Sequence, residues 1–220
     1  MTQIKRWLLG CLILIAGIVL VGGATRLTGS GLSMVDWRPI MGSIPPMTTA
    51  AWDATFNAYQ QSPEFQKINF NMTLSEFKSI FFWEYIHRML GRLIGLFAVI
   101  PFLYFSYKKQ LPTGFKKRWI GVIFLIGGQG LMGWYMVKSG LVDNPHVSHF
   151  RLAAHLSLAF IIFILIFREF LAIQFDSLQR IKPSKLSRLS LGVLGLIGAQ
   201  IIYGAFTAGL DAGHYYNTYP

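Results

Sequence analysis

The sequence predicts an all-α integral membrane protein, a transmembrane bundle of five helices. Apolar residues make up 53% of the 220 residues and charged residues only 13%, whereas a typical soluble domain has about 25% charged residues. Uncharged runs recur at about the 20 residues that a helix needs to cross a bilayer core of ~30 Å. This composition excludes a disordered chain, and a single cysteine, Cys11, excludes a disulfide scaffold.

Five segments have the length and composition of a membrane span. They are residues 7–24, 82–107, 119–137, 152–167 and 189–208. The fourth is short and becomes long enough if Arg151 and Arg168 extend their charged ends to the interfaces. The first follows Lys5 and Arg6, as a signal peptide would. Its apolar run is long for that role, and we predict a retained helix.

The distribution of basic residues predicts the orientation, because cytoplasmic loops are enriched in Lys and Arg. If the N-terminus is cytoplasmic, twelve of the 20 basic residues lie inside: Lys5, Arg6, Lys108, Lys109, Lys116, Lys117, Arg118, Arg168, Arg180, Lys182, Lys185 and Arg188. The outer side then holds Arg26, Arg38, Lys67, Lys78, Lys138 and Arg151. A net charge of +11 is also typical of nucleic-acid binding. Here the basic clusters alternate with apolar spans, and no nucleic acid is expected as a partner.

A long outer loop, residues 25–80, follows the first span. Its mixture of tryptophans, prolines and polar residues is compatible with an ordered cover over a site and equally with a solvated connector. The segment 73–76, Thr-Leu-Ser-Glu, predicts the capped start of a short surface helix, because a Thr hydroxyl can accept from free helical amides.

Ionisable residues within the second span need a reason, since charges are costly at bilayer depth. Glu84 and His87 share a helix face at i and i+3, and Arg88 lies at i+4 from Glu84. In one interpretation these are interface charges, with Arg88 paired to Glu84 and His87 solvated. In the other, His155, about one turn into the fourth span, joins His87 so that two imidazoles face one flat ligand.

Several ligands fit two imidazoles. Zinc would use Glu84, His87 and His155, whereas a di-iron bundle site needs a second Glu-x-x-His sequence and further glutamates. Haem needs only axial ligands and an apolar slot. The glycines around residue 130 suit such a slot or plain helix packing. Arginine forks can hold haem propionates, and the candidate propionate contacts are Arg26, Arg88, Arg92 and Arg151. These patterns indicate a bis-histidine site near the outer face and specify no reaction. The remaining histidines, His146, His149 and His214, are expected to be solvated in outer loops.

A weak internal repeat relates the first and fifth spans. Gly23-Ala24 matches Gly204-Ala205 at a shift of 181 residues, with Asp36 on Asn217 and Pro39 on Pro220. Internal repeats are common in membrane proteins. We therefore expect residues 1–170 to form a first four-helix half and residues 171–220 to begin an incomplete second half. The sequence is expected to be truncated at its C-terminal end.

Five stretches of this chain resemble the haem A synthase family, the membrane haem O hydroxylases, and they are most similar to its proteobacterial and mitochondrial branch. The stretches are GGATRLTGSGLS at 22–33, WEYIHRMLGR at 83–92, GGQGLMGW at 127–134 with SGL at 139–141, RLAAHL at 151–156, and GAFTAGLDAG at 204–213 with NTYP at 217–220. They occur in the family's order over nearly the whole chain.

The resemblance implies eight helices in two pseudo-symmetric four-helix halves, each with a histidine pair facing a haem pocket on the outer side of the bacterial inner membrane. It implies an oxidoreductase that converts a methyl group of haem O to a formyl group by successive hydroxylations, giving haem A for cytochrome c oxidase. One half receives haem O and the other holds haem b. Carried over residue by residue, Glu84 is the catalytic carboxylate, and His87 and His155 are the first-half haem iron ligands.

Two departures from the family pattern matter. The second-half histidines are absent, so we expect an incomplete haem b site and an inactive chain on its own. The cysteine pair that some members carry in the first outer loop is also absent, and Cys11 is expected to face lipid or the core.

The implied partners are haem O and its synthase, cytochrome c oxidase assembly, membrane lipid and an electron donor of unspecified identity. A second copy of the chain, forming a homo-oligomer, is a further candidate. The alternative functions are a bis-His cytochrome b-type electron-transfer protein and a haem-free transporter or assembly factor. The bis-histidine pattern fits both haem-binding functions.

Overall fold

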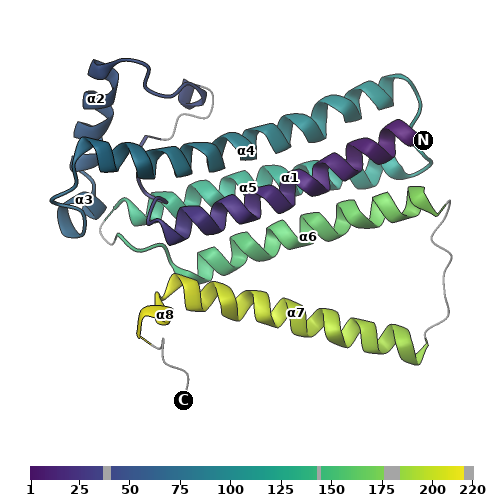
Figure 1. Cartoon of the computed structure of the whole chain (residues 1–220). Coiled ribbons are helices and arrows are strands. Elements are labelled where there is room, and N and C mark those ends of the chain that lie inside the picture. Colours follow the sequence, from purple (N-terminus) through teal and green to yellow (C-terminus); the bar gives the residue numbers. More distant parts are fainter. Residues whose placement is uncertain (37–40, 143–144, 176–183, 216–220) are drawn as a thin grey trace. The chain divides into compact units, whose positions relative to one another are not determined.

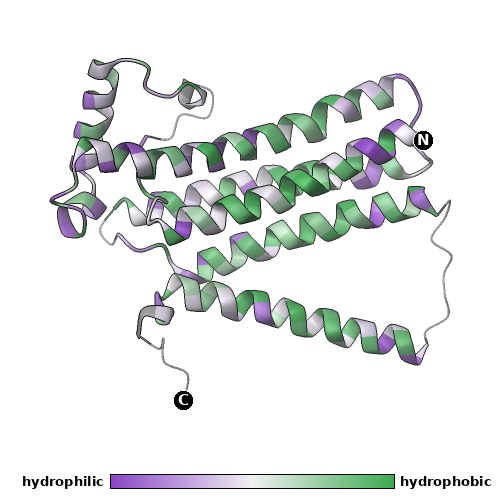
Figure 2. Cartoon of the chain, viewed as in Figure 1, coloured by the Kyte–Doolittle hydropathy of each residue, from purple (hydrophilic) through white to green (hydrophobic). Residues whose placement is uncertain are grey.

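The computed structural model describes residues 1–36, 41–142, 145–175 and 184–215, and the regular elements among these residues are all helices. Five helices are long and apolar enough to cross a membrane: α1 (Thr2–Leu27), α4 (Leu74–Tyr107), α5 (Phe115–Gly140), α6 (His149–Gln174) and α7 (Lys185–Gly209) (Figure 1). Each contains one predicted span, which confirms the predicted all-α membrane fold. Apolar residues cover these helices along most of their length (Figure 2).

Shorter helices occupy the α1–α4 connection and the end of the described chain. They are η1 (Met41–Ser43), α2 (Thr49–Gln60), α3 (Pro63–Lys67) and α8 (Ala212–Tyr215). The chain divides into two compact units. The first unit comprises Met1–Ala16, Ile94–Gln129 and His149–Pro220, and the second comprises Gly17–Leu93 and Gly130–Ser148. The proposed division into residues 1–170 and 171–220 stays a prediction.

In the first unit, α6 packs against α7 where the His149 and Phe206 rings meet, with centroids 5.4 Å apart. A Cβ at Gly209 would lie 2.6 Å from the His149 Cβ, so glycine permits this approach. The prediction that His149 is a solvated loop residue is therefore wrong, because it begins α6 and packs on α7. His146 is exposed as expected, and the side chain of His214 lies outside the described part.

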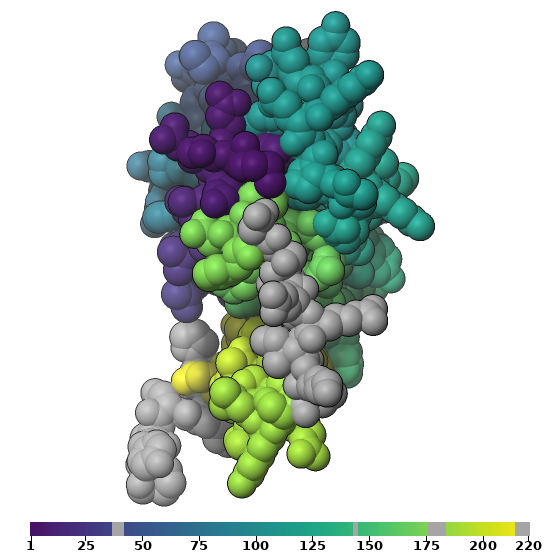
Figure 3. Space-filling model, turned by 90° about the vertical axis from the view of Figure 1, so that its right-hand side faces the viewer, coloured from purple at the N-terminus to yellow at the C-terminus, as the bar shows by residue number. Residues whose placement is uncertain are grey.

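One face of the first unit carries the N-terminal end of α1, the α4–α5 connection and the N-terminal end of α7 (Figure 3). In the first turn of α5, Arg118 makes two hydrogen bonds of 2.7 and 3.0 Å to the buried carboxylate of Glu169 on α6. Arg168 adds a third contact of 2.8 Å to the same carboxylate. Cys11 is 2% exposed and faces the core rather than lipid.

Pro101 interrupts the hydrogen bonding of α4, and a tryptophan of the first unit, Trp7, compensates for it. A proline has no N–H to donate to the carbonyl four residues earlier, which here belongs to Phe97. The Trp7 indole donates to the Phe97 oxygen at 2.8 Å, and the Trp119 indole donates to the Ala98 oxygen at 3.1 Å. In an apolar medium an unsatisfied carbonyl is costly, so the Trp7 indole makes the proline tolerable inside the helix.

In the second unit, α2 and α3 pack on the beginning of α4 through an aromatic cluster of Tyr59, Phe77 and Phe81 with Trp52 against it. Thr48 and Ser62 cap α2 and α3 by accepting from the amides of Ala51 and Phe65. The described part of the α1–α4 connection is thus ordered, as one of the two sequence interpretations required.

The Thr73–Glu76 segment caps a helix, but a different one from the predicted short surface helix. The Thr73 amide donates to Glu76 Oε2 at 2.8 Å, and the Glu76 amide lies 3.4 Å from the Thr73 hydroxyl oxygen. These two contacts cap the first turn of α4 itself. The membrane helix therefore starts eight residues before the predicted residue 82, at Leu74, because its first two turns pack under the aromatic cluster.

The Trp7 indole provides a test of how α4 tolerates its proline. Trp7→Phe should lower the free energy of unfolding by about 1–3 kcal/mol, because the Phe97 carbonyl becomes unsatisfied. In a Pro101→Ala background the residue at 101 regains an N–H for that carbonyl, and the same Trp7→Phe change should have a smaller effect. Thermal unfolding in detergent gives the double-mutant cycle. Equal effects in both backgrounds would contradict this account.

Candidate functional site

Glu84 is a buried charge of the second unit with three hydrogen-bond donors around it. Its side chain is 3% exposed and lies on α4. Oε1 accepts from Arg88 Nη2 at 2.6 Å, and Oε2 accepts from the Ser33 hydroxyl at 2.6 Å and the Met34 amide at 2.8 Å. Three donors, one of them a guanidinium, balance the charge of a buried carboxylate. The carboxylate thereby joins the α1–α4 connection to α4.

The segment that reaches Glu84 is a compact turn at the end of α1. Gly29 has φ +62°, a left-handed conformation that favours glycine. The Thr28 and Ser30 hydroxyls are hydrogen bonded to each other, and Ser30 and Ser33 are fully buried. The Ser33 hydroxyl also lies 3.1 Å from the Ser30 carbonyl oxygen. Its single proton goes to the closer, charged oxygen of Glu84.

Arg88 also holds the α1–α4 connection against α4. Besides Glu84, its guanidinium donates to the Met34 carbonyl at 3.0 Å and to the Asp36 carbonyl at 3.5 Å. The Arg88–Glu84 pairing that one sequence interpretation predicted is therefore present. Both members of the pair bond the same loop residue, because the Met34 amide donates to Glu84 and the Met34 carbonyl accepts from Arg88. The ion pair therefore holds the loop on α4.

His87 lies one turn after Glu84 and is packed against α1. Its Nδ1 atom is buried and has no hydrogen-bond partner among the described residues. The ring also has a hydrogen bond with the backbone of Ile18. A Cβ at Gly22 would lie 3.0 Å from His87 Cε1, so glycine leaves room for the imidazole. Metal-ligating histidines typically anchor one ring nitrogen to a protein group and offer the other, and His87 fits that pattern.

His155 belongs to the first unit, on α6. The Gln129 side chain of α5 donates to the His155 carbonyl at 3.0 Å, and its Oε1 atom is buried without a hydrogen-bond partner in the described part of the unit. Gln129 therefore fixes the α6 backbone at His155.

The other candidate propionate contacts lie on three different helices. Arg26 is in the last turn of α1, and Arg92 on α4 lies 3.9 Å from the Met89 sulfur. Both are partly buried in the second unit, whereas Arg151, near the start of α6, is partly buried in the first. Across the residues that the structure describes, no three His, Cys, Asp or Glu side chains gather as metal ligands.

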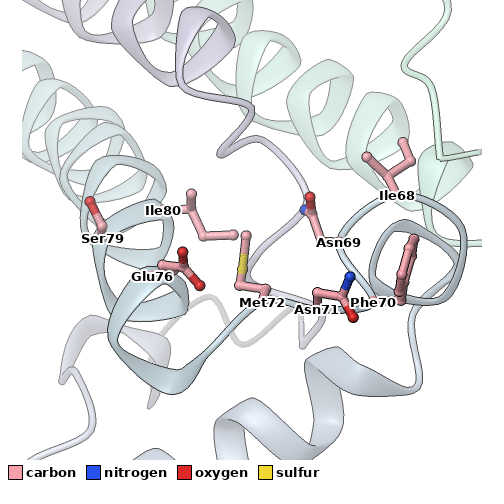
Figure 4. A pocket seen from close by; sticks show the side chains of 8 residues that line it. All are labelled: Ile68, Asn69, Phe70, Asn71, Met72, Glu76, Ser79 and Ile80. Atoms are coloured by element: carbon pink, nitrogen blue, oxygen red, sulfur yellow. The ribbon is translucent and has the colours of Figure 1, made fainter.

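Two hollows lie among the described residues of the second unit and bear on the site. One, of about 490 Å³, lies between the end of α3 and the first turns of α4, where Asn69, Met72 and Glu76 point into it (Figure 4). It is a broad surface depression whose acidic residue, Glu76, already caps α4. The other, of about 280 Å³, lies beside Arg88 and is bounded by Met34 and Trp134.

A buried acid lies on α3, the helix that precedes the first hollow in the chain. Glu64 of α3 is 7% exposed and accepts from the Tyr59 hydroxyl at 3.0 Å, and Asn69 donates to the Tyr59 oxygen at 2.8 Å. Burial raises the pKa of Glu64 to about 7; the Tyr59 hydrogen bond opposes that rise and the negative charge of Glu84 adds to it. Burial likewise raises the pKa of Tyr59.

The raised pKa of Glu64 makes the stability of the α2–α3 region depend on pH. Its folded pKa of about 7 exceeds the ordinary value of 4.5, so protonation stabilises the fold. The contribution is complete below pH 4.5 and is lost as pH rises through about 7. We expect the thermal unfolding midpoint, followed by Trp52 fluorescence, to decrease as the pH rises from 4.5 to about 7. Glu64→Gln should remove that slope, and an unchanged slope would contradict the assignment.

The sequence does not single out three residues that contact candidate site residues or line a hollow beside them: Ser33, Gln129 and Lys138. Ser33 and Gln129 lie within stretches that resemble the family, yet their contacts depend on residues 51 and 26 positions away. Lys138 was counted only as an outer-loop charge, although its ammonium lies over the Trp134 ring. No local pattern marks such partners.

These features define a multi-pass helical membrane protein in which a buried ion pair fastens an ordered connection to a membrane helix beside a histidine. Over residues 5–220 the chain matches the model of the COX15-CtaA family, described as a cytochrome oxidase assembly protein, and it belongs to this family.

Curated relatives agree with that membership. The chain is 47% identical to a protein named Heme A synthase from Nitrosospira multiformis, over 97% of this chain and 61% of the relative. It is 46% identical to the Heme A synthase of Rickettsia bellii, over 99% of this chain and 66% of the relative. This chain thus spans about two thirds or less of their length. No solved structure matches it.

Proposed function

We propose that this chain forms the haem O-binding half of a haem A synthase. The observation that carries the proposal is the buried His87 Nδ1 without a partner, held against Gly22 one turn from a buried carboxylate. An iron would satisfy that nitrogen. The family membership and the names of the relatives support the same function. His155 is the proposed second ligand of the same iron, as two imidazoles suit haem.

In this proposal haem O is the substrate, and its iron supplies the oxidative chemistry when it is bound. The chain's own residues bind and orient it. His87 and His155 hold the iron, and Arg26, Arg88, Arg92 and Arg151 are the proposed propionate contacts. Positive charge develops at the ring methyl carbon as it is oxidised. The charge of Glu84, fixed by three donors in a low-dielectric region, would stabilise it.

Electrostatic stabilisation suits Glu84 better than proton transfer. All three contacts of its oxygens come from donors that point at the carboxylate, so it is preorganised as an acceptor. It also sits beside Arg88, which keeps the buried charge balanced. We therefore assign Glu84 a fixed negative charge during catalysis.

The membrane placement follows the charge distribution. The ends of α1, α4, α5 and α7 at the face in Figure 3 adjoin the basic clusters of residues 5–6, 108–118 and 185–188. From the positive-inside rule we propose that this face lies on the cytoplasmic side of a bacterial inner membrane and that Glu84, in the N-terminal half of α4, lies toward the outer side. Residues 171–220 begin the proposed second half, which would hold haem b. The proposed partners are haem O synthase, an electron donor and the assembly pathway of cytochrome c oxidase.

Replacing Glu84 tests the activity. The assay uses a fusion protein that continues this chain with the unmatched portion of the Nitrosospira multiformis relative, expressed where haem O is made. Glu84→Gln should lower haem A formation by about 100-fold or more, as loss of an electrostatic stabiliser does. Extracted pigments are identified by mass. Full activity of Glu84→Gln would contradict the catalytic role.

Ser33→Ala is the matched control for the loop. It removes one donor to Glu84 and should destabilise the connection by about 1.5–3 kcal/mol while haem A formation persists. If Ser33→Ala abolished the product as completely as Glu84→Gln, Glu84 would act only by holding the loop.

The cytochrome b-type alternative has one observation in its favour, because a carboxylate occupied by three donors also suits a purely structural role. That protein would bind haem through His87 and His155 and form no haem A. The pigment analysis of the unmodified fusion protein separates the two functions.

A further inference from the structure

The hollow of about 280 Å³ beside Arg88 lies wholly within the second unit. Met34 and Val35 of the α1–α4 connection, Arg88 of α4, and Trp134 and Lys138 near the end of α5 supply its walls. Ligand pockets usually measure ~300–1,000 Å³. The hollow is therefore large enough for one edge of a macrocycle rather than for a whole one.

The charges of this hollow do not cancel. Glu84 neutralises Arg88 across 2.6 Å. Lys138 forms no ion pair in the part of the chain that the structure describes, and its ammonium rests over the Trp134 ring, 5.0 Å from the centroid. Within the described residues, the hollow thus presents the positive charge of the exposed Lys138 beside the apolar surfaces of Met34 and Trp134. Its complement is an anionic group carried on an apolar body.

We propose that Lys138 and Arg88 bind a propionate carboxylate of the tetrapyrrole, with its ring edge against Met34 and Trp134. The inference rests on the proposed function and adds Lys138 to it as a binding residue. The hydrogen bonds of Glu84 then have a second consequence, besides holding the loop on α4. By holding both Arg88 and Met34, Glu84 fixes two walls of this hollow.

A structural role for Lys138 makes different predictions. A cation in the last turn of a helix interacts favourably with the helix dipole, and lysines and tryptophans gather at membrane interfaces. Lys78 provides a matched control for the contact between an exposed lysine and a tryptophan ring, because its ammonium lies over the Trp52 ring at 5.1 Å in the same unit. Lys78 is not among the residues that line this hollow.

The test compares two probes, ferric protohaem IX and its dimethyl ester, in which both propionates are uncharged. Each is titrated into the purified chain in detergent, and binding is followed by the Soret absorbance. Lys138→Gln should weaken binding of the free acid about three- to tenfold, as expected for a partly exposed charge contact. It should leave the affinity for the ester unchanged. Lys138→Arg should retain the wild-type preference, and Lys78→Gln should alter neither affinity.

Two results would overturn the inference alone. In one, Lys138→Gln binds both probes as the unmodified chain does. In the other, it weakens both equally, as lost packing would. Failure of the unmodified chain to bind either probe would overturn the proposed haem-binding function and this inference with it.

Discussion

The buried Glu84 carboxylate is the interaction on which the second unit depends. A charge with 3% exposure in a membrane protein must be paired and hydrogen bonded. Arg88, Ser33 and Met34 meet that requirement, and in doing so they bring a loop segment about fifty positions earlier onto α4. The turn at Gly29, the position of Met34 and the direction of the Arg88 guanidinium all follow from that pairing.

The same rule, that polar groups in an apolar medium need partners, explains the first unit. Pro101 would leave the Phe97 carbonyl without its helical donor, and the Trp7 indole supplies one. Glu169 is buried between two arginines. The rule has exceptions among the described residues, because Gln129 Oε1 in the first unit and His87 Nδ1 in the second are buried without a hydrogen-bond partner. The position of the His87 ring against Gly22, with its other contact to the backbone of Ile18, is the arrangement typical of a metal-ligating histidine.

The membrane helices could be predicted from the sequence, because bilayer thickness sets their length and an apolar run of that length is visible directly in the sequence. The sequence was also sufficient to bring Glu84, His87 and Arg88 onto one face, because helical spacing is regular. It placed the start of α4 too late, since Leu74 through Phe81 are held by packing of α2 and α3 rather than by a bilayer. It misplaced His149 for a similar reason, as the partner, Phe206, is distant in sequence.

The contacts that shape the site were beyond sequence reasoning. Ser33 reaches Glu84 only because Gly29 adopts a positive φ and turns the chain back. Lys138 lines the same hollow as Arg88 only because the loop residue Met34 forms another of its walls. Both depend on three-dimensional pairing, which short-range patterns do not encode. The role of Glu84 as the attachment point of the loop emerges from the structure.

The most direct test of the central claim is the absorption and electron paramagnetic resonance spectrum of the purified chain loaded with haem. We expect low-spin iron with two imidazole ligands, converted to a high-spin or weakly bound form by His87→Ala and equally by His155→Ala. His146→Ala, at an exposed position, should leave the spectrum unchanged. A low-spin spectrum that survives His87→Ala would contradict the assignment of that nitrogen to the haem iron.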